Sequence, residues 1–161
     1  MLIQIAGITE DSIVDGPGLR LTVFVQGCPH NCPSCHNPET HRFDGGQTMD
    51  TAEIIAKMDA NPLLDGLTLS GGEPFCQWDA CIELADAAYQ RGLNVWCYTG
   101  YTYRQLTQDG AHILLDHIDV LVDGPYIDSM RTLELPWRGS KNQRVINLNG
   151  REIDDATVFH S

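Results

Sequence analysis

Apolar residues along this chain alternate between the spacing of strands and the spacing of helices. Short apolar runs typical of buried strands occupy residues 21–25, 66–70, 94–100 and 118–122. Between them, residues 48–66, 78–91 and 111–117 have the periodicity of amphipathic helices. This order predicts a parallel sheet with right-handed crossovers. Since an eight-unit barrel needs about 250 residues, we expect residues 1–161 to form a single α/β domain. Its architecture would be an open, incomplete (β/α) barrel with a largely parallel sheet.

The segments outside this repeat are shorter. Leu2 to Ile8 alternates apolar and polar residues, which predicts a short strand covering an edge of the sheet. Asp50 and Glu53 have the spacing of a capping box at the start of the first helix. Residues 137–144 have the composition of a solvated loop before the short apolar run at 145–148.

Three cysteines, spaced C-x3-C-x2-C, follow the first buried strand at Cys28, Cys32 and Cys35. Thiolates are the usual ligands of iron-sulfur clusters, and three of them on one cubane leave one iron without a protein ligand. An open coordination position allows a small molecule to bind the metal and react. Zinc held by these cysteines and His36 is an alternative, although structural zinc sites usually pair two separated knuckles and His36 is awkwardly placed beside Cys35.

Two glycines end the second buried strand, in the segment Ser70-Gly71-Gly72-Glu73-Pro74. Glycines at the carboxyl end of a strand let a ligand approach the backbone closely, and α/β folds place their sites at these ends. An ordinary turn is the alternative interpretation.

Composition narrows the class of protein. The 22 acidic residues against 10 basic ones give a net charge of -12, which argues against a nucleic-acid partner.

No apolar run approaches the ~18 residues needed to span a bilayer. We expect no secretory leader, since the start of the chain is too short and unflanked to be one. We therefore expect a cytoplasmic protein whose cysteines are reduced thiols and do not form a disulfide framework. Cys81 and Cys97 are predicted core residues, whereas Cys76 has no assigned role.

The cysteine triplet followed by Ser-Gly-Gly-Glu-Pro resembles the two hallmarks of the radical S-adenosylmethionine (SAM) enzymes. Within that superfamily, the chain resembles the small activating enzymes of anaerobic (class III) ribonucleotide reductase. The similarity extends from about residue 12 to residue 148, and the short length of the chain also fits these enzymes. Four further motifs carry it: Asp15-Gly16-Pro17-Gly18-x-Arg20, Val95-Trp96-x-Tyr98-Thr99-Gly100, Val122-Asp123-Gly124 and Arg138-Gly139-Ser140-x-Asn142-Gln143.

This resemblance implies a chemistry carried by two cofactors, one 4Fe-4S cluster and SAM. The cluster would be held by Cys28, Cys32 and Cys35. The reduced cluster passes an electron to SAM, and cleavage yields methionine and a 5′-deoxyadenosyl radical, which removes hydrogen from a glycine of the reductase. A flavodoxin or ferredoxin is the expected electron donor. Since cofactors carry the hard chemistry, no histidine is assigned as a general base.

The resemblance also suggests which residues contact SAM. The amino group would meet Gly71, Gly72 and Glu73, and the adenine would meet the backbone of Ser34, Cys35 and His36. Ser34 replaces the aromatic residue that many superfamily members have at that position. From their predicted place at strand carboxyl ends, Thr99 and Asp123 are expected to line the SAM pocket.

The basic polar loop near the end of the chain is predicted to dock the reductase. Its residues are Arg138, Gly139, Ser140, Asn142 and Gln143. Alternative functions are activation of another glycyl-radical enzyme, another small radical SAM activity such as ring contraction in deazapurine synthesis, or, from a different class, a zinc-binding interaction module.

Overall fold

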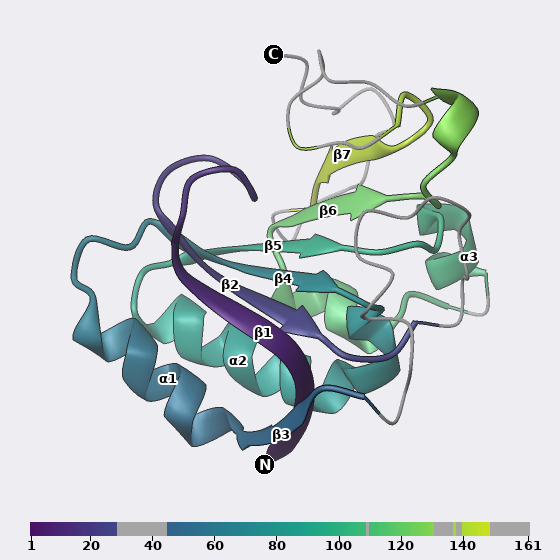
Figure 1. The fold of residues 1–161 in the computed structure, drawn as a ribbon. Coiled ribbons are helices and arrows are strands. Elements are labelled where there is room, and N and C mark those ends of the chain that lie inside the picture. Colours follow the sequence, from purple (N-terminus) through teal and green to yellow (C-terminus); the bar gives the residue numbers. More distant parts are fainter. Residues whose placement is uncertain (29–44, 109, 131–136, 138–139, 149–161) are drawn as a thin grey trace.

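The computed structural model describes residues 1–28, 45–108, 110–130, 137 and 140–148. In this part of the chain, strands form one seven-stranded sheet in the order β3-β1-β2-β4-β5-β6-β7 (Figure 1). The strands are β1 (Leu2–Ser12), β2 (Arg20–Val25), β3 (Gln47–Asp50), β4 (Gly66–Gly71), β5 (Asn94–Tyr98), β6 (Val120–Asp123) and β7 (Arg144–Asn147).

The four central strands β2, β4, β5 and β6 run parallel to one another. β1 and β3 add antiparallel pairings on one side, and β7 adds one on the other. The sheet is open, since its two outermost strands, β3 and β7, are not neighbours in the order. The predicted α/β fold with an open sheet is confirmed, and the parallel part is the central four strands.

Helices cover one face of this sheet. α1 (Thr51–Ala60) and α2 (Trp78–Gln90) pack side by side below it in Figure 1, while the short α3 (Tyr103–Thr107) lies near the carboxyl ends of β5 and β6. The 3-10 helices are η2 (Pro74–Gln77), η3 (Ile113–His117) and η4 (Asp128–Met130). The predicted capping box is present, because Asp50 accepts from the Ala52 amide and Glu53 accepts from the Asp50 amide. No helix in the described ranges has the length and apolarity needed to cross a membrane.

The two faces of the sheet bury different side chains, because successive residues of a strand point to opposite faces. Leu67, Leu69 and Cys97 belong to the large core between the sheet and the helices α1 and α2. On the other face, Trp96 packs with valines of β6 and β7 and, edge to face, with Trp137 at 5.0 Å between ring centroids. This second face therefore has a small core of its own, which contains two tryptophans.

Several short elements differ from the sequence prediction. β1 is longer than expected and is not the edge strand, because β3 pairs with its outer side. Residues 113–117 form a 3-10 helix. β3 and α3, with 4 and 5 residues, are too short to show a period.

The motif from Asp15 to Arg20 braces the amino ends of the strands. Arg20 is fully buried, and its guanidinium donates to Thr68 Oγ1 at 2.7 Å, to the Leu67 carbonyl at 2.9 Å and to the Pro17 carbonyl at 2.9 Å. It also lies over the Trp96 ring, 5.7 Å from the centroid. Burial lowers the pKa of Arg20 to about 10. Because Arg20 begins β2 and the cysteine loop follows its end, this brace lies far from the cysteines along the strand.

We predict that Arg20→Met lowers the free energy of unfolding by about 3 kcal/mol, because it leaves several buried acceptors without their donor. Arg91→Met is the matched control, since Arg91 is exposed and pairs with Asp59 on the surface. Urea unfolding of both variants measures the difference. Equal losses would contradict the bracing role.

Candidate functional site

The carboxyl ends of the four parallel strands lie at one edge of the sheet, and each carries a residue singled out in the sequence. Cys28 follows β2, Gly72 follows β4, Thr99 follows β5, and Asp123 is the last residue of β6. Open α/β sheets bind their ligands at this edge. The structure thus gathers residues from four separate segments of the chain.

The glycine turn after β4 is held against the segment that leads to Cys28. Gly71 has φ +93°, a conformation that favours glycine, and the Gly72 amide donates to the Val25 carbonyl at 2.8 Å. A Cβ on Gly72 would lie 2.3 Å from the Gly27 carbonyl oxygen. Both glycines are therefore required for two backbones to approach each other, and the start of the cysteine loop is fixed by that approach.

Glu73 ties this turn to the end of β5. Its side chain is fully buried. The carboxylate accepts from Thr99 Oγ1 at 2.8 and 2.9 Å, from the Gly100 amide at 2.8 Å and from the Phe75 amide at 3.1 Å. Glu73 was predicted to act near the amino group of a ligand. In the structure its oxygens accept hydrogen bonds from the chain itself, and these bonds position the Gly-Gly turn.

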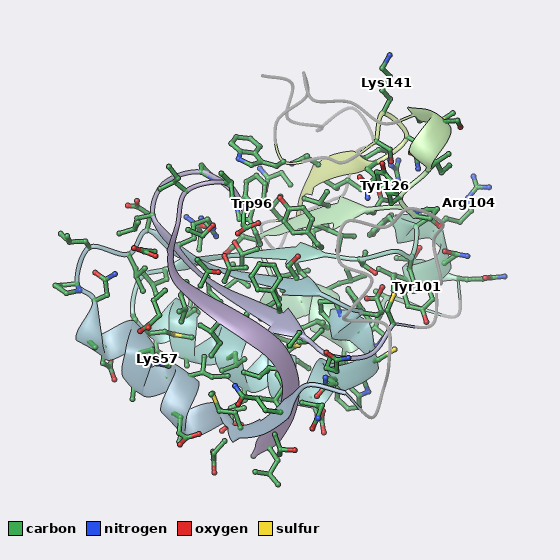
Figure 2. The ribbon with its side chains drawn as sticks, viewed as in Figure 1. Lys57, Trp96, Tyr101, Arg104, Tyr126 and Lys141 are labelled. Atoms are coloured by element: carbon green, nitrogen blue, oxygen red, sulfur yellow. The ribbon has the colours of Figure 1, made fainter. Side chains whose placement is uncertain are left out.

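Tyr101 is a residue of this edge that the sequence reasoning missed. Burial raises the pKa of its phenol, and electrostatic interactions with Cys76, Glu73 and Cys28 raise it further. Its carbonyl accepts from the Gly124 amide at 2.8 Å. Figure 2 shows Tyr101 at the right-hand side of the molecule. Its position directly after Thr-Gly at a strand end was the available signal.

Asp123 joins β6 to its neighbours. The carboxylate is 2 % exposed, accepts from the Tyr103 amide at 2.7 Å and forms an ion pair with Arg144 at 2.9 Å. It therefore holds the start of α3 and the start of β7 at the site edge. Thr99 and Asp123 are brought to the same edge as predicted, and both are almost fully buried.

The motif before β7 folds back on the turn after β6. Ser140 is fully buried, its amide donates to Gln143 Oε1 at 3.0 Å, and Gln143 Nε2 donates to the Gly124 carbonyl at 3.1 Å. Asn142 Nδ2 donates to the Pro125 carbonyl at 2.8 Å. The prediction of a solvated loop is wrong for these three residues, because their side chains satisfy backbone groups of the neighbouring turn.

Several predicted site residues lie outside the described residues. These are Cys32, Ser34, Cys35, His36, Arg138 and Gly139. Among the described residues, no three His, Cys, Asp or Glu side chains form a metal site. Cys28, half-buried, is the one predicted cluster ligand that the structure describes.

The other three described cysteines lie in two different environments. Cys81 and Cys97 are fully buried in the core, which confirms the prediction, and burial raises the pKa of both thiols. Cys76 is exposed in η2 beside the site edge. Its thiol pKa is raised by partial burial and by Glu73.

The two described histidines have structural contacts. His112 packs edge to face on Phe75 at 4.9 Å, and His117 Nδ1 lies 2.6 Å from an Asp86 carboxylate oxygen. Neither contact supplies a general base at the site edge.

Comparisons with known proteins converge on one family. The family described as a 4Fe-4S single cluster domain matches residues 14–146. A Vibrio cholerae anaerobic ribonucleoside-triphosphate reductase-activating protein is 38 % identical over 139 residues, which cover 81 % of this chain and 89 % of the relative. The Escherichia coli protein of that name is 38 % identical over 144 residues, which cover 84 % of this chain and 93 % of the relative. The Haemophilus influenzae protein is 34 % identical over 143 residues, which cover 81 % of this chain and 89 % of the relative.

Among solved structures, QueE from Escherichia coli is similar with a TM-score of 0.46 and 17 % identity, over 63 % of this chain and 54 % of that one. This similarity is too weak to decide either fold or function.

We predict that Gly72→Ala prevents stable cluster assembly, because the added methyl forces the Gly-Gly turn away from the Gly27 carbonyl and moves the start of the cysteine loop. Gly7→Ala is the matched control, since nothing lies within 4 Å of its Cβ position. Iron per chain after anaerobic reconstitution measures the effect. Full iron content in Gly72→Ala would contradict it.

A second prediction concerns the hydroxyl of Thr99. Thr99→Val removes a donor from the buried Glu73 carboxylate and should lower the free energy of unfolding by about 2 kcal/mol. It should also speed hydrogen exchange at the Gly72 and Glu73 amides. Thr99→Ser keeps the donor and should restore both properties. If valine and serine behaved alike, the link between Glu73 and β5 would be unimportant.

Proposed function

The chain belongs to the anaerobic ribonucleoside-triphosphate reductase-activating proteins, and from this membership we propose that it generates the glycyl radical of such a reductase by reductive cleavage of SAM. The observation that carries this proposal is the extent of the similarity. It spans the cysteine motif, the Gly-Gly edge and the tail, within one matched region from residue 14 to residue 146. The match to a 4Fe-4S domain also favours a cluster over zinc in the cysteine loop.

Cys28, Cys32 and Cys35 would hold the cluster. The described part of the loop fits this task, because Cys28 follows a segment whose backbone is pinned by the Gly-Gly turn. When bound, the cluster supplies the single electron that cleaves SAM. The chain binds and orients both groups and excludes other reactants.

The SAM site would lie on the same edge. The amino group would meet the backbone of the Gly71-Gly72 turn and the nearby charge of Glu73, whose own hydrogen bonds hold the turn in place. The backbone of Ser34, Cys35 and His36 would contact the adenine. Thr99 and Asp123 would border the pocket and keep β5 and β6 in place beside it.

The partners follow from this chemistry. The glycyl-radical subunit of the reductase is the substrate protein, and a flavodoxin or ferredoxin would supply the electron. We place the protein in the cytoplasm and treat residues 1–161 as one domain, with no membrane or nucleic-acid partner. The net charge of -12 is consistent with the last point.

Cysteine variants test the cluster assignment. Alanine at Cys28, Cys32 or Cys35 should abolish iron binding, formation of 5′-deoxyadenosine and nucleotide reduction by the added reductase. Cys81→Ala removes a buried core thiol and should leave all three intact. Iron analysis, chromatography of 5′-deoxyadenosine and the reductase assay measure them under anaerobic conditions. Retained SAM cleavage in a triplet variant would contradict the assignment.

Asp123→Asn tests the pocket border. The amide keeps the size of the side chain but loses the ion pair with Arg144, so we expect an increase of roughly ten-fold in the Kd for SAM. Asp119→Asn, which changes a carboxylate near the amino end of β6, is the control. Unchanged SAM affinity in Asp123→Asn would remove Asp123 from the SAM site.

A further inference from the structure

Most of the basic side chains that the structure describes in this acidic protein are buried or paired with a carboxylate, and two are not. Of the six that the structure describes, Arg20 is buried, Lys57 pairs with Glu10, Arg91 pairs with Asp59 and Arg144 pairs with Asp123, which leaves Arg104 and Lys141. Both are exposed and form no ion pair with any described residue. Because the chain carries a net charge of -12, an acidic partner is attracted chiefly where such charges remain available.

Arg104 and Lys141 are both held at the edge that carries the candidate site. Arg104 belongs to α3, whose first amide, that of Tyr103, donates to Asp123 at 2.7 Å. Lys141 lies in the turn before β7, and its amide donates to the Met130 carbonyl at 2.8 Å. In Figure 2 both side chains extend outward at the upper right, whereas Lys57 lies at the lower left.

Exposed apolar side chains accompany these charges. Ile127 is 36 % exposed and Met130 is 44 % exposed. The Ile127 amide donates to Ser140 Oγ at 3.3 Å, so this segment is anchored to the turn that carries Lys141. Arginine and methionine are enriched in protein interfaces, and a mixture of apolar and cationic groups is suited to an acidic protein surface.

We propose that Arg104, Ile127, Met130 and Lys141, here called the basic rim, form the surface on which an acidic face of the reductase docks. The proposal rests on the proposed function, because it concerns the partner of that same site. Within the tail, the docking role then belongs to Lys141. The side chains of Ser140, Asn142 and Gln143 are engaged with the neighbouring turn instead.

The strand order favours the reductase over the electron donor. The cysteine loop follows β2, whereas the basic rim follows β5 and β6 and precedes β7. β6 lies three strands from β2, which is about 14 Å at the usual spacing. A donor has to approach the cysteine loop, while the reductase has to bring its glycine to the proposed SAM pocket, whose expected borders Thr99 and Asp123 lie at the ends of β5 and β6. The basic rim is therefore on the reductase's side of the pocket.

The test uses the reconstituted holoenzyme with the anaerobic reductase of the same organism at limiting concentration. Arg104→Glu combined with Lys141→Glu should raise the KM for the reductase roughly ten-fold or more at low salt, because like charges then face each other. The maximal radical yield and the SAM cleavage driven by dithionite without reductase should not change. Lys57→Glu reverses a single charge on α1, and each single rim variant, Arg104→Glu or Lys141→Glu, makes the matching change of two charge units. Lys57→Glu should leave the KM unaltered, whereas each single rim variant should raise it.

Salt provides an independent readout. The wild-type KM should rise as sodium chloride is added, and the KM of the double variant should respond much less. An unchanged KM in the double variant, with wild-type SAM cleavage intact, would overturn the basic rim alone. A wild-type protein that cleaves no SAM with dithionite would overturn the proposed function and the rim together. A defect seen only when flavodoxin replaces dithionite would assign the rim to the electron donor and overturn its assignment to the reductase.

Discussion

The site edge depends on one buried carboxylate. Taking an ionised carboxylate out of water costs several kcal/mol unless donors surround it, and Glu73 receives hydrogen bonds from Thr99 Oγ1 and from the Gly100 and Phe75 amides. These donors belong to two strand ends that are separate in sequence. The requirement to satisfy the carboxylate therefore fixes the end of β4 relative to the end of β5, and the Gly-Gly turn is fixed with it.

The same arrangement recurs one strand further along the sheet. Asp123 is buried at the end of β6 and is satisfied by the Tyr103 amide and by Arg144. Gln143 and Asn142 then close the turn after β6 through its carbonyl groups. Several motif residues thus serve to hold the edge together. A site that must bind a cluster and a cosubstrate on loops gains from such rigid support, because small displacements cost much of the catalytic rate.

Much of the fold could be predicted from the sequence because its elements are long or strongly patterned. The buried runs of β2 and β4 and the capping box of α1 are local signals. β3, α3 and the pairing of β7 with β6 could not be predicted, because short elements have no period and their formation depends on neighbours distant in sequence.

At the site, the sequence indicated which residues gather at the strand ends but not what their side chains contact. The hydrogen bonds between Glu73 and Thr99 depend on the register of β4 and β5, which no local pattern contains. Arg20 belongs to a recognisable motif, but no local pattern indicates that its side chain is buried against Thr68 and Trp96. The inward direction of Ser140 was missed because its motif is polar, and polarity alone does not distinguish a solvated loop from one that satisfies a neighbouring turn.

If this chain produces a glycyl radical on its reductase from SAM, the radical is visible by electron paramagnetic resonance. The sample is the anaerobically reconstituted, reduced protein mixed with SAM and the reductase. We expect a glycyl-radical doublet that requires SAM and requires Cys28, Cys32 and Cys35. The absence of a doublet, in samples where iron is bound and the reductase is intact, would show that the chain does not generate this radical.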